Sequence, residues 1–252
     1  MKKILLIGFL LLTPACQAAA PTPEPSLSPT GTLPPTLMPV SPTSEPTLTP
    51  EPPPTPEPFP TPLPRYFTEG FDSPFTGWII LQAGNEALPN VSTENNSLRL
   101  QMDAPYTWLY ALYGAQDYAD VRLETQFVNS ALSPASAGLV CRYSETDGWF
   151  EYNVSTDGAY NVLYGKWLSV GVADYLPIID GSSKEIGQSG ETQQIGLTCS
   201  GSTLRLHING NIVRSVDVSR YKLTEGKAGL AASSFENVPV VAVFDWITIS
   251  EP

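Results

Sequence analysis

Residues 149–160 read WFEYNVSTDGAY, and this stretch decides the fold. In its first half, phenylalanine, tyrosine and valine alternate with tryptophan, glutamate and asparagine. Successive side chains of a β-strand point to opposite faces, so the alternation predicts a half-buried strand. The Asp157-Gly158 pair that follows is typical of a hairpin turn, because glycine tolerates positive φ angles. The stretch therefore predicts a strand that turns back into a second one.

The same two-residue period recurs through residues 65–252. It is clearest in the segments 98–102, 121–127, 139–143, 195–199 and 204–208. A second hairpin signal, Asn209-Gly210-Asn211, follows the last of these, and no stretch shows helical spacing over three turns. We therefore predict one all-β domain over 65–252, an antiparallel two-sheet jelly-roll sandwich. Residues 168–190 are expected to form a long loop.

Five stretches of this domain carry a family resemblance. They are FDSPFTGW (71–78), GLVCRY (138–143), VSTDGAY (154–160), LRLHING (204–210) and FDWITI (244–249). Together they resemble the concanavalin A-like lectin/glucanase superfamily, in particular its laminin-G-like modules and the domain called 3-keto-disaccharide hydrolase. The resemblance implies a jelly-roll fold. It leaves function open among lectins, adhesion modules and glycosidases, because a fold does not determine what its sites do.

The first fifteen residues have the organisation of an export signal. Two lysines precede the apolar run 4–12, which is about half as long as a membrane-spanning helix. The sequence LTPAC that ends at Cys16 resembles a bacterial lipobox, although Thr13 and Pro14 depart from the usual pattern. The resemblance implies that residues 1–15 are a lipoprotein signal peptide and that Cys16 is lipidated. The alternative is plain secretion with an incidental cysteine.

Residues 16–64 differ in composition from the rest of the chain. From Pro21 to Pro64, 18 of 44 residues are proline and no lysine or arginine occurs. Proline lacks the backbone donor that helices and sheets need, and the segment has too few apolar residues for a core. We expect a disordered Pro/Thr-rich stalk with polyproline II segments behind the lipid anchor. Its expected role is to space the 65–252 domain from the membrane surface.

The net charge of −12 limits the partners of the protein. Nucleic acid binding needs a basic surface, so we expect none. The same charge disfavours adsorption to anionic lipid head groups, which leaves the lipid on Cys16 as the expected membrane contact. The sequence thus predicts an exported protein, anchored to the cell membrane, with its domain outside the cytoplasm.

Cys141 and Cys199 remain once Cys16 is assigned to the lipid. An even pair of cysteines in an oxidising compartment is typical of a disulfide. Both cysteines occupy apolar positions of their predicted strands, so they are expected to face each other in the core. Two buried free thiols are the alternative.

A carbohydrate site is predicted on the polar face of the strand that begins at Trp149. A tryptophan can stack on the C–H face of a sugar, and neighbouring amides and charged groups can bind its hydroxyls. The candidate ligand-binding residues are Trp149, Glu151, Asn153, Asn161, Trp167, Arg142 and His207. The alternative is that these aromatic residues belong to the core and rim of the sandwich.

Catalysis is not expected from the sequence. Glycoside hydrolysis needs two carboxylates at a defined separation, and the glucanases of this fold carry a Glu-x-Asp-x-Glu run on one strand. The sequence has no such run: Glu145, Asp147 and Glu151 are interrupted by a predicted turn. The single histidine, His207, lies beside a hairpin turn with no triad motif around it.

The resemblance also implies a calcium site. Many sandwiches of this superfamily bind a structural calcium where the first and last strands meet. Asp245 shares a register with apolar residues of 241–249, and a buried carboxylate needs a cation or several donors. Asp72 is the second candidate ligand. The alternative is that Asp245 accepts hydrogen bonds from the backbone of the 71–78 turn.

The sequence therefore predicts a cell-surface lipoprotein that displays a non-catalytic binding module, with carbohydrate as the expected ligand. A structural or adhesive module that binds a surface protein is the alternative. A glycoside hydrolase with dispersed carboxylates is the third hypothesis.

Overall fold

A computed structural model describes residues 63–73, 75–129 and 135–252 of the protein. The predicted signal peptide, Cys16 and nearly all of the predicted stalk lie outside these residues. In the part of the chain that is described, no helix is long and apolar enough to cross a membrane.

The described residues form fifteen β-strands and one short 3-10 helix, η1 (Ser219–Tyr221). The strands are β1 (Phe67–Glu69), β2 (Trp78–Gly84), β3 (Asn90–Glu94), β4 (Ser97–Met102), β5 (Thr107–Tyr113), β6 (Val121–Asn129), β7 (Ala135–Ser144), β8 (Gly148–Ser155), β9 (Ala159–Ser169), β10 (Val172–Ser182), β11 (Thr192–Ser200), β12 (Thr203–Ile208), β13 (Asn211–Asp217), β14 (Lys227–Ser234) and β15 (Val240–Ser250).

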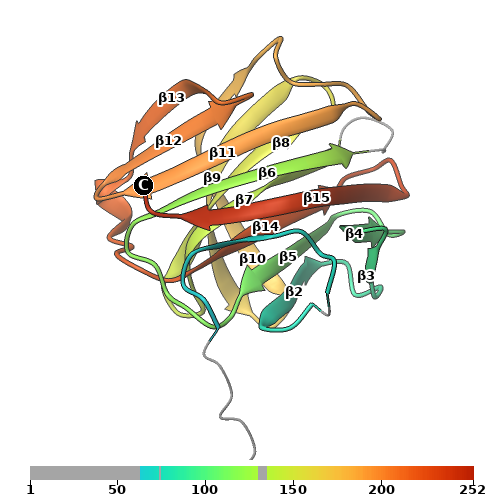
Figure 1. Ribbon diagram of the computed structural model, residues 1–252, viewed down its shortest axis with the longest axis horizontal. Helices are drawn as coiled ribbons and strands as arrows, with labels where there is room; N and C mark the ends of the chain where they lie inside the picture. The colour runs from blue at the N-terminus through green and yellow to red at the C-terminus, as the bar shows by residue number, and fades with distance from the viewer. Residues whose placement is uncertain (1–62, 74, 130–134) are drawn as a thin grey trace, which may run out of the picture. The chain divides into compact units, whose positions relative to one another are not determined.

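These strands form two antiparallel sheets that face each other (Figure 1). Sheet A has the order β13-β12-β11-β6-β15-β4-β3, and β1 also pairs with β15. Sheet B has the order β10-β9-β8-β7-β14-β5-β2. The prediction of an all-β, two-sheet antiparallel jelly roll is confirmed.

The main core lies between the two sheets. Strand β6 shows how the sequence builds it, because Val121, Leu123, Thr125 and Phe127 are buried while the alternate positions Arg122, Glu124 and Gln126 stay half-exposed. Burial of such apolar side chains is the largest favourable contribution to the free energy of folding. It amounts to about 25 cal/mol per Å² of apolar surface removed from water.

Strand β8 departs from this rule, because both of its faces are buried. A second hydrophobic cluster covers the outer face of sheet B, with buried Tyr110, Leu112, Val140, Trp149 and Ala231. Further residues of β2, β9 and β10 pack against this cluster. The edges of the sheet meet over it, where the Gly84 backbone N–H donates to the carbonyl of Gly171 at 2.9 Å.

The expectation of a long loop over 168–190 is wrong, because residues 172–182 form the edge strand β10. Pro177 hid the strand pattern, since proline lacks a backbone donor and interrupts a ladder. Here it lies on the sheet edge and beside an irregularity in the pairing with β9, where a proline is tolerated.

The predicted disulfide is confirmed: Cys141 on β7 is bonded to Cys199 on β11, with their Cα atoms 6.7 Å apart. The bond therefore joins sheet B to sheet A through the core.

Candidate ligand-binding groove

A hydrogen-bonded group on the outer face of sheet B is centred on Glu151. Its carboxylate accepts hydrogen bonds from the Tyr110 hydroxyl (3.0 Å), the Trp149 indole N–H (3.2 Å) and the Asn153 side-chain amide (2.8 Å). The Tyr110 hydroxyl lies 2.7 Å from that of Tyr175 on β10. Burial raises the pKa of Glu151 above its usual range, and the three hydrogen bonds partly oppose this rise.

The expectation that Trp149 forms an exposed stacking platform is wrong. Trp149, Glu151 and Asn153 do point outward from sheet B, but all three are buried. Side chains of β9 and β10 cover this face, since Trp167, Ala173 and Tyr175 pack against the cluster that includes Trp149. A local alternation pattern reports which residues share a face, but it does not report whether a later strand covers that face.

Two further predicted residues lie elsewhere. His207 is on β12 in sheet A, buried, with its ring nitrogen Nε2 3.2 Å from the Thr198 hydroxyl. Arg142 is buried on β7 at a pairing irregularity and has a positive φ of 53°, so it does not follow the outward register. The structure therefore does not group these two residues with Trp149. Asn161 does lie nearby, on β9, with its side-chain oxygen 3.4 Å from the Asn153 amide nitrogen.

An open groove of about 1040 Å³ lies beside the buried cluster, and Trp167 belongs to it. Its walls come from β2, the β7–β8 turn, the β9–β10 turn and the segment that leads into β14. The lining residues are Ile79, Ile80, Leu81, Gln82, Asp117, Tyr143, Ser144, Glu145, Thr146, Asp147, Trp167, Leu168, Ser169, Val170, Gly171, Lys222, Leu223, Thr224, Glu225, Gly226 and Lys227.

Trp167 and Tyr143 supply the aromatic surface of this groove, and both are half-exposed. The Trp167 indole N–H donates to the Tyr143 hydroxyl at 2.9 Å. Both rings also contact buried Trp149, with centroid separations of 5.2 Å for Trp167 and 5.5 Å for Tyr143. Trp149 thus supports the aromatic surface from beneath.

Apolar side chains form one rim of the groove. Leu168 and Val170, in and beside the β9–β10 turn, are 68% and 102% exposed, and Ile79 and Ile80 of β2 are also exposed. Isolated apolar side chains at a protein surface need no explanation, but adjacent ones beside a groove are typical of a binding site.

Carboxylates outnumber ammonium groups in the lining. Asp117 pairs with Lys227 at 3.1 Å, and the Asp147 carboxylate accepts hydrogen bonds from the hydroxyls of Ser144 and Thr146. Glu145, Glu225 and Lys222 are exposed. The groove is therefore polar on one side, apolar on the other, and weakly acidic.

The predicted calcium ligand Asp245 is less buried than its register in the sequence indicates. An irregularity between Phe244 and Trp246 in the pairing with β6 interrupts the register that was expected to bury it, and Asp245 is half-exposed. Its carboxylate accepts hydrogen bonds from Gln126 (2.8 Å) and Ser97 (3.4 Å). Asp72 is exposed, and no group of three or more His, Cys, Asp or Glu residues suited to a metal occurs among the described residues. Calcium binding stays a prediction.

Tyr143 and the segment 222–227 were not singled out from the sequence. Glu145 and Asp147 were considered there only as catalytic carboxylates, and residues 168–171 only as part of the predicted loop 168–190. The sequence carries one signal, for the 168–171 segment alone: the glycine-containing apolar stretch LSVGV at 168–172, which turns between β9 and β10.

No family model matches the sequence, and no curated protein matches it. Solved structures do match. The Bacillus licheniformis β-glucanase shares 14% identity over 74% of this chain and 98% of its own, with a TM-score of 0.53. A prokaryotic β-1,3-1,4-glucanase (lichenase) from a mouse hindgut metagenome shares 11% over 74% and 99%, with a TM-score of 0.54. The fold is the concanavalin A-like jelly roll.

A third structure of this fold is a Bacillus subtilis protein of unknown function, described as galectin-like. It shares 11% identity over 73% of this chain and 94% of its own, with a TM-score of 0.54. At these identities the likeness concerns the fold alone, which therefore does not decide between binding and catalysis.

Proposed function

We propose that the domain binds carbohydrate in the groove and does not catalyse its cleavage. The observation that carries the proposal is the hydrogen-bonded pair of Trp167 and Tyr143, half-exposed in a groove of about 1040 Å³. Aromatic rings that are fixed by neighbours stack on the C–H faces of sugars, and the serine, threonine and carboxylate groups of the β7–β8 turn can bind hydroxyls. Two proteins of the same fold are named glucanases, which makes a glycan the favoured ligand class.

The charge of the groove favours a neutral glycan. Its lining carries four carboxylates (Asp117, Glu145, Asp147, Glu225) against two ammonium groups (Lys222, Lys227). A polyanionic chain would meet like charge at close range, which disfavours binding.

The absence of catalysis is proposed from the hydrogen bonds of Glu151. Hydrolysis of a glycosidic bond uses two carboxyl groups that flank it. Glu151, the buried carboxylate of this face, is hydrogen-bonded to tyrosine, tryptophan and asparagine side chains and is closed off from solvent. Release of reducing sugar from any glycan that the protein binds would overturn this part of the proposal.

We further propose that Cys16 carries the lipid anchor and that residues 17–64 hold the domain away from the membrane. The lipobox-like sequence and the proline-rich composition support this arrangement. Metabolic labelling with a fatty acid tests it. Label should appear on the wild-type protein and disappear in Cys16→Ser, and label that persists in the variant would contradict the anchor.

The test of binding uses the full chain with Cys16→Ser and a panel of soluble neutral polysaccharides, including mixed-linkage β-glucan, in affinity electrophoresis and calorimetry. Trp167→Ala should weaken binding about tenfold or more, as expected for a central aromatic contact. Trp167→Phe should retain part of the affinity. Ile212→Ala, at an exposed apolar position on sheet A, is the matched control and should bind like the wild type.

A protein ligand is the second candidate function, and the exposed apolar rim at Leu168 and Val170 favours it. The same panel separates the two. Equal affinity of Trp167→Ala and wild type for every polysaccharide, or no binding by either, would contradict the carbohydrate proposal.

A further inference from the structure

Arg142 occupies an unusual position for a charged side chain. It is 3% exposed, next to the disulfide-bonded Cys141, on a strand that otherwise packs in the core. Its positive φ of 53° coincides with the pairing irregularity between Cys141 and Ser144, which turns the side chain away from the outer face of sheet B. Burying a guanidinium costs free energy unless its donors are paired, so the position needs an account.

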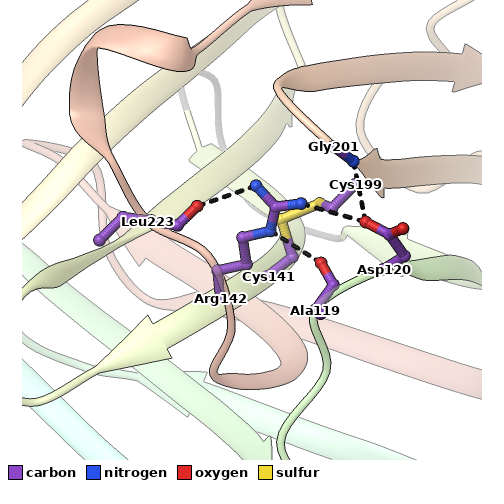
Figure 2. A network of polar contacts seen from close by, with 7 residues as sticks. All are labelled: Ala119, Asp120, Cys141, Arg142, Cys199, Gly201 and Leu223. Atoms are coloured by element: carbon purple, nitrogen blue, oxygen red, sulfur yellow. Dashed lines mark hydrogen bonds and ion pairs between the residues drawn. A yellow bond between two sulfur atoms is a disulfide. The ribbon is translucent and has the colours of Figure 1, made fainter.

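The guanidinium of Arg142 binds two segments that are far apart in the sequence (Figure 2). Nε donates to the carbonyl of Ala119 at 2.9 Å, and Nη1 donates to the carbonyl of Leu223 at 2.9 Å. Nη2 lies 3.3 Å from the carboxylate of Asp120, which also accepts the backbone N–H of Gly201 at 2.8 Å. Three nitrogens of one planar group thus fix the positions of three acceptors.

Both segments lead into the wall of the groove. Tyr118 and Gly226 form a two-way backbone pair, with N–O distances of 2.8 and 3.2 Å. One residue away on each side, Asp117 and Lys227 form the ion pair at 3.1 Å. Asp117, Leu223, Gly226 and Lys227 all line the groove. Arg142 therefore holds this wall by hydrogen bonds while its own side chain is buried and does not line the groove.

A lysine at this position would not make the same contacts. The guanidinium is planar and directs its donors in a fixed fork, whereas an ammonium is a single point of charge at the end of a flexible chain. Burial lowers the pKa of Arg142, and Asp120 opposes this fall.

We propose that Arg142 is a positioning residue of the ligand groove: it fixes the segments 117–120 and 222–227 relative to β7, and so sets the shape of one groove wall. The inference rests on the proposed function for its effect on ligand binding, but the anchoring itself is independent of any ligand.

The first test is hydrogen exchange on the full chain with Cys16→Ser, which needs no ligand. Arg142→Lys should raise amide exchange in 117–120 and 222–227 by about tenfold or more, as expected for lost hydrogen bonds to a charged group. Asp120→Asn, a milder change at a half-exposed side chain, should raise it less and in the same segments. Unchanged exchange in both segments would overturn the proposal.

The second test compares affinity for mixed-linkage β-glucan. Ile208→Val, a core change on β12 in sheet A, controls for a general loss of stability. Arg142→Lys should bind the glucan with an affinity about tenfold or more below that of the wild type. Ile208→Val should bind like the wild type, even if its melting temperature is as low as that of Arg142→Lys. Equal loss in both variants would overturn the positioning role. If wild type binds no polysaccharide, the proposed function fails, and the exchange result alone decides whether Arg142 anchors the wall.

Discussion

At the scale of the residue, Glu151 is a buried carboxylate in β8 whose environment affects the stability of the domain. None of the ion pairs among the described residues includes it, so its charge is stabilised by three neutral donors. Hydrogen bonds from neutral donors offset only part of the cost of removing a carboxylate from water. The raised pKa of Glu151 expresses that remaining cost.

The pH dependence of stability should therefore include a contribution from Glu151. Its folded-state pKa lies above the value of an unfolded glutamate, about 4.3. Its stabilising contribution is fully present below that value and is lost as the pH rises through the folded-state pKa. In the wild type, the free energy of unfolding should therefore fall as the pH rises through this range. We expect Glu151→Gln to show a smaller fall, as measured by urea unfolding at several pH values. Glu145→Gln makes the same carboxyl-to-amide change at an exposed groove position and is the matched control.

At the scale of the element, β8 and β10 show what sequence reasoning can and cannot reach. The alternation in β8 predicted which residues share a face, because that property depends only on the geometry of one strand. Burial of that face depends on β10, whose pattern Pro177 interrupts and whose Ala173 and Tyr175 pack against the cluster. The disulfide was predictable from two apolar positions, whereas the groove, formed by turns that are distant in the sequence, was not.

The contact between β9 and Trp149 gives a prediction at this scale. A Cβ atom on Gly165 would lie 2.3 Å from Cε2 of the Trp149 ring, so alanine there must displace the ring or the strand. Overpacking of this kind costs about 1–3 kcal/mol. We expect Gly165→Ala to lower the free energy of unfolding by that amount in urea titrations and to shift the fluorescence of Trp149 and Trp167.

Gly70→Ala is the control for this substitution. No heavy atom lies within 4 Å of a Cβ placed on Gly70, so the variant should unfold close to the wild-type midpoint. Equal stability of Gly165→Ala and Gly70→Ala would show that β9 does not pack on Trp149 as described.

At the scale of the whole molecule, the disulfide between Cys141 and Cys199 links the two sheets through side chains, in addition to the backbone connections. It closes a loop with a sequence separation of 58 residues. For a loop of this length, the chain-entropy model gives a stabilisation of about 4 kcal/mol. The double variant Cys141→Ala/Cys199→Ala should lose roughly this free energy of unfolding in urea, and wild type under reducing conditions should lose a similar amount. A loss well below 1 kcal/mol in both would contradict a stabilising role.

The second prediction at the scale of the whole molecule concerns its charge. The net charge of −12 and the acidic groove both repel anionic ligands. We expect wild type to bind neutral glucan and not a carboxylated polysaccharide such as polygalacturonate. Glu145→Lys/Glu225→Lys reverses two exposed groove charges and should create polygalacturonate binding that weakens as salt is added, because added ions screen exposed charges.

The control for charge is Glu94→Lys/Glu251→Lys, which makes the same change in net charge at exposed positions outside the groove. If only the total charge of the molecule mattered, both double variants would bind polygalacturonate equally. If the groove selects its ligand, only the groove variant will bind it. Loss of that binding on adding Trp167→Ala to the groove variant would then place the polyanion in the same site as the neutral glucan, and retention would place it elsewhere.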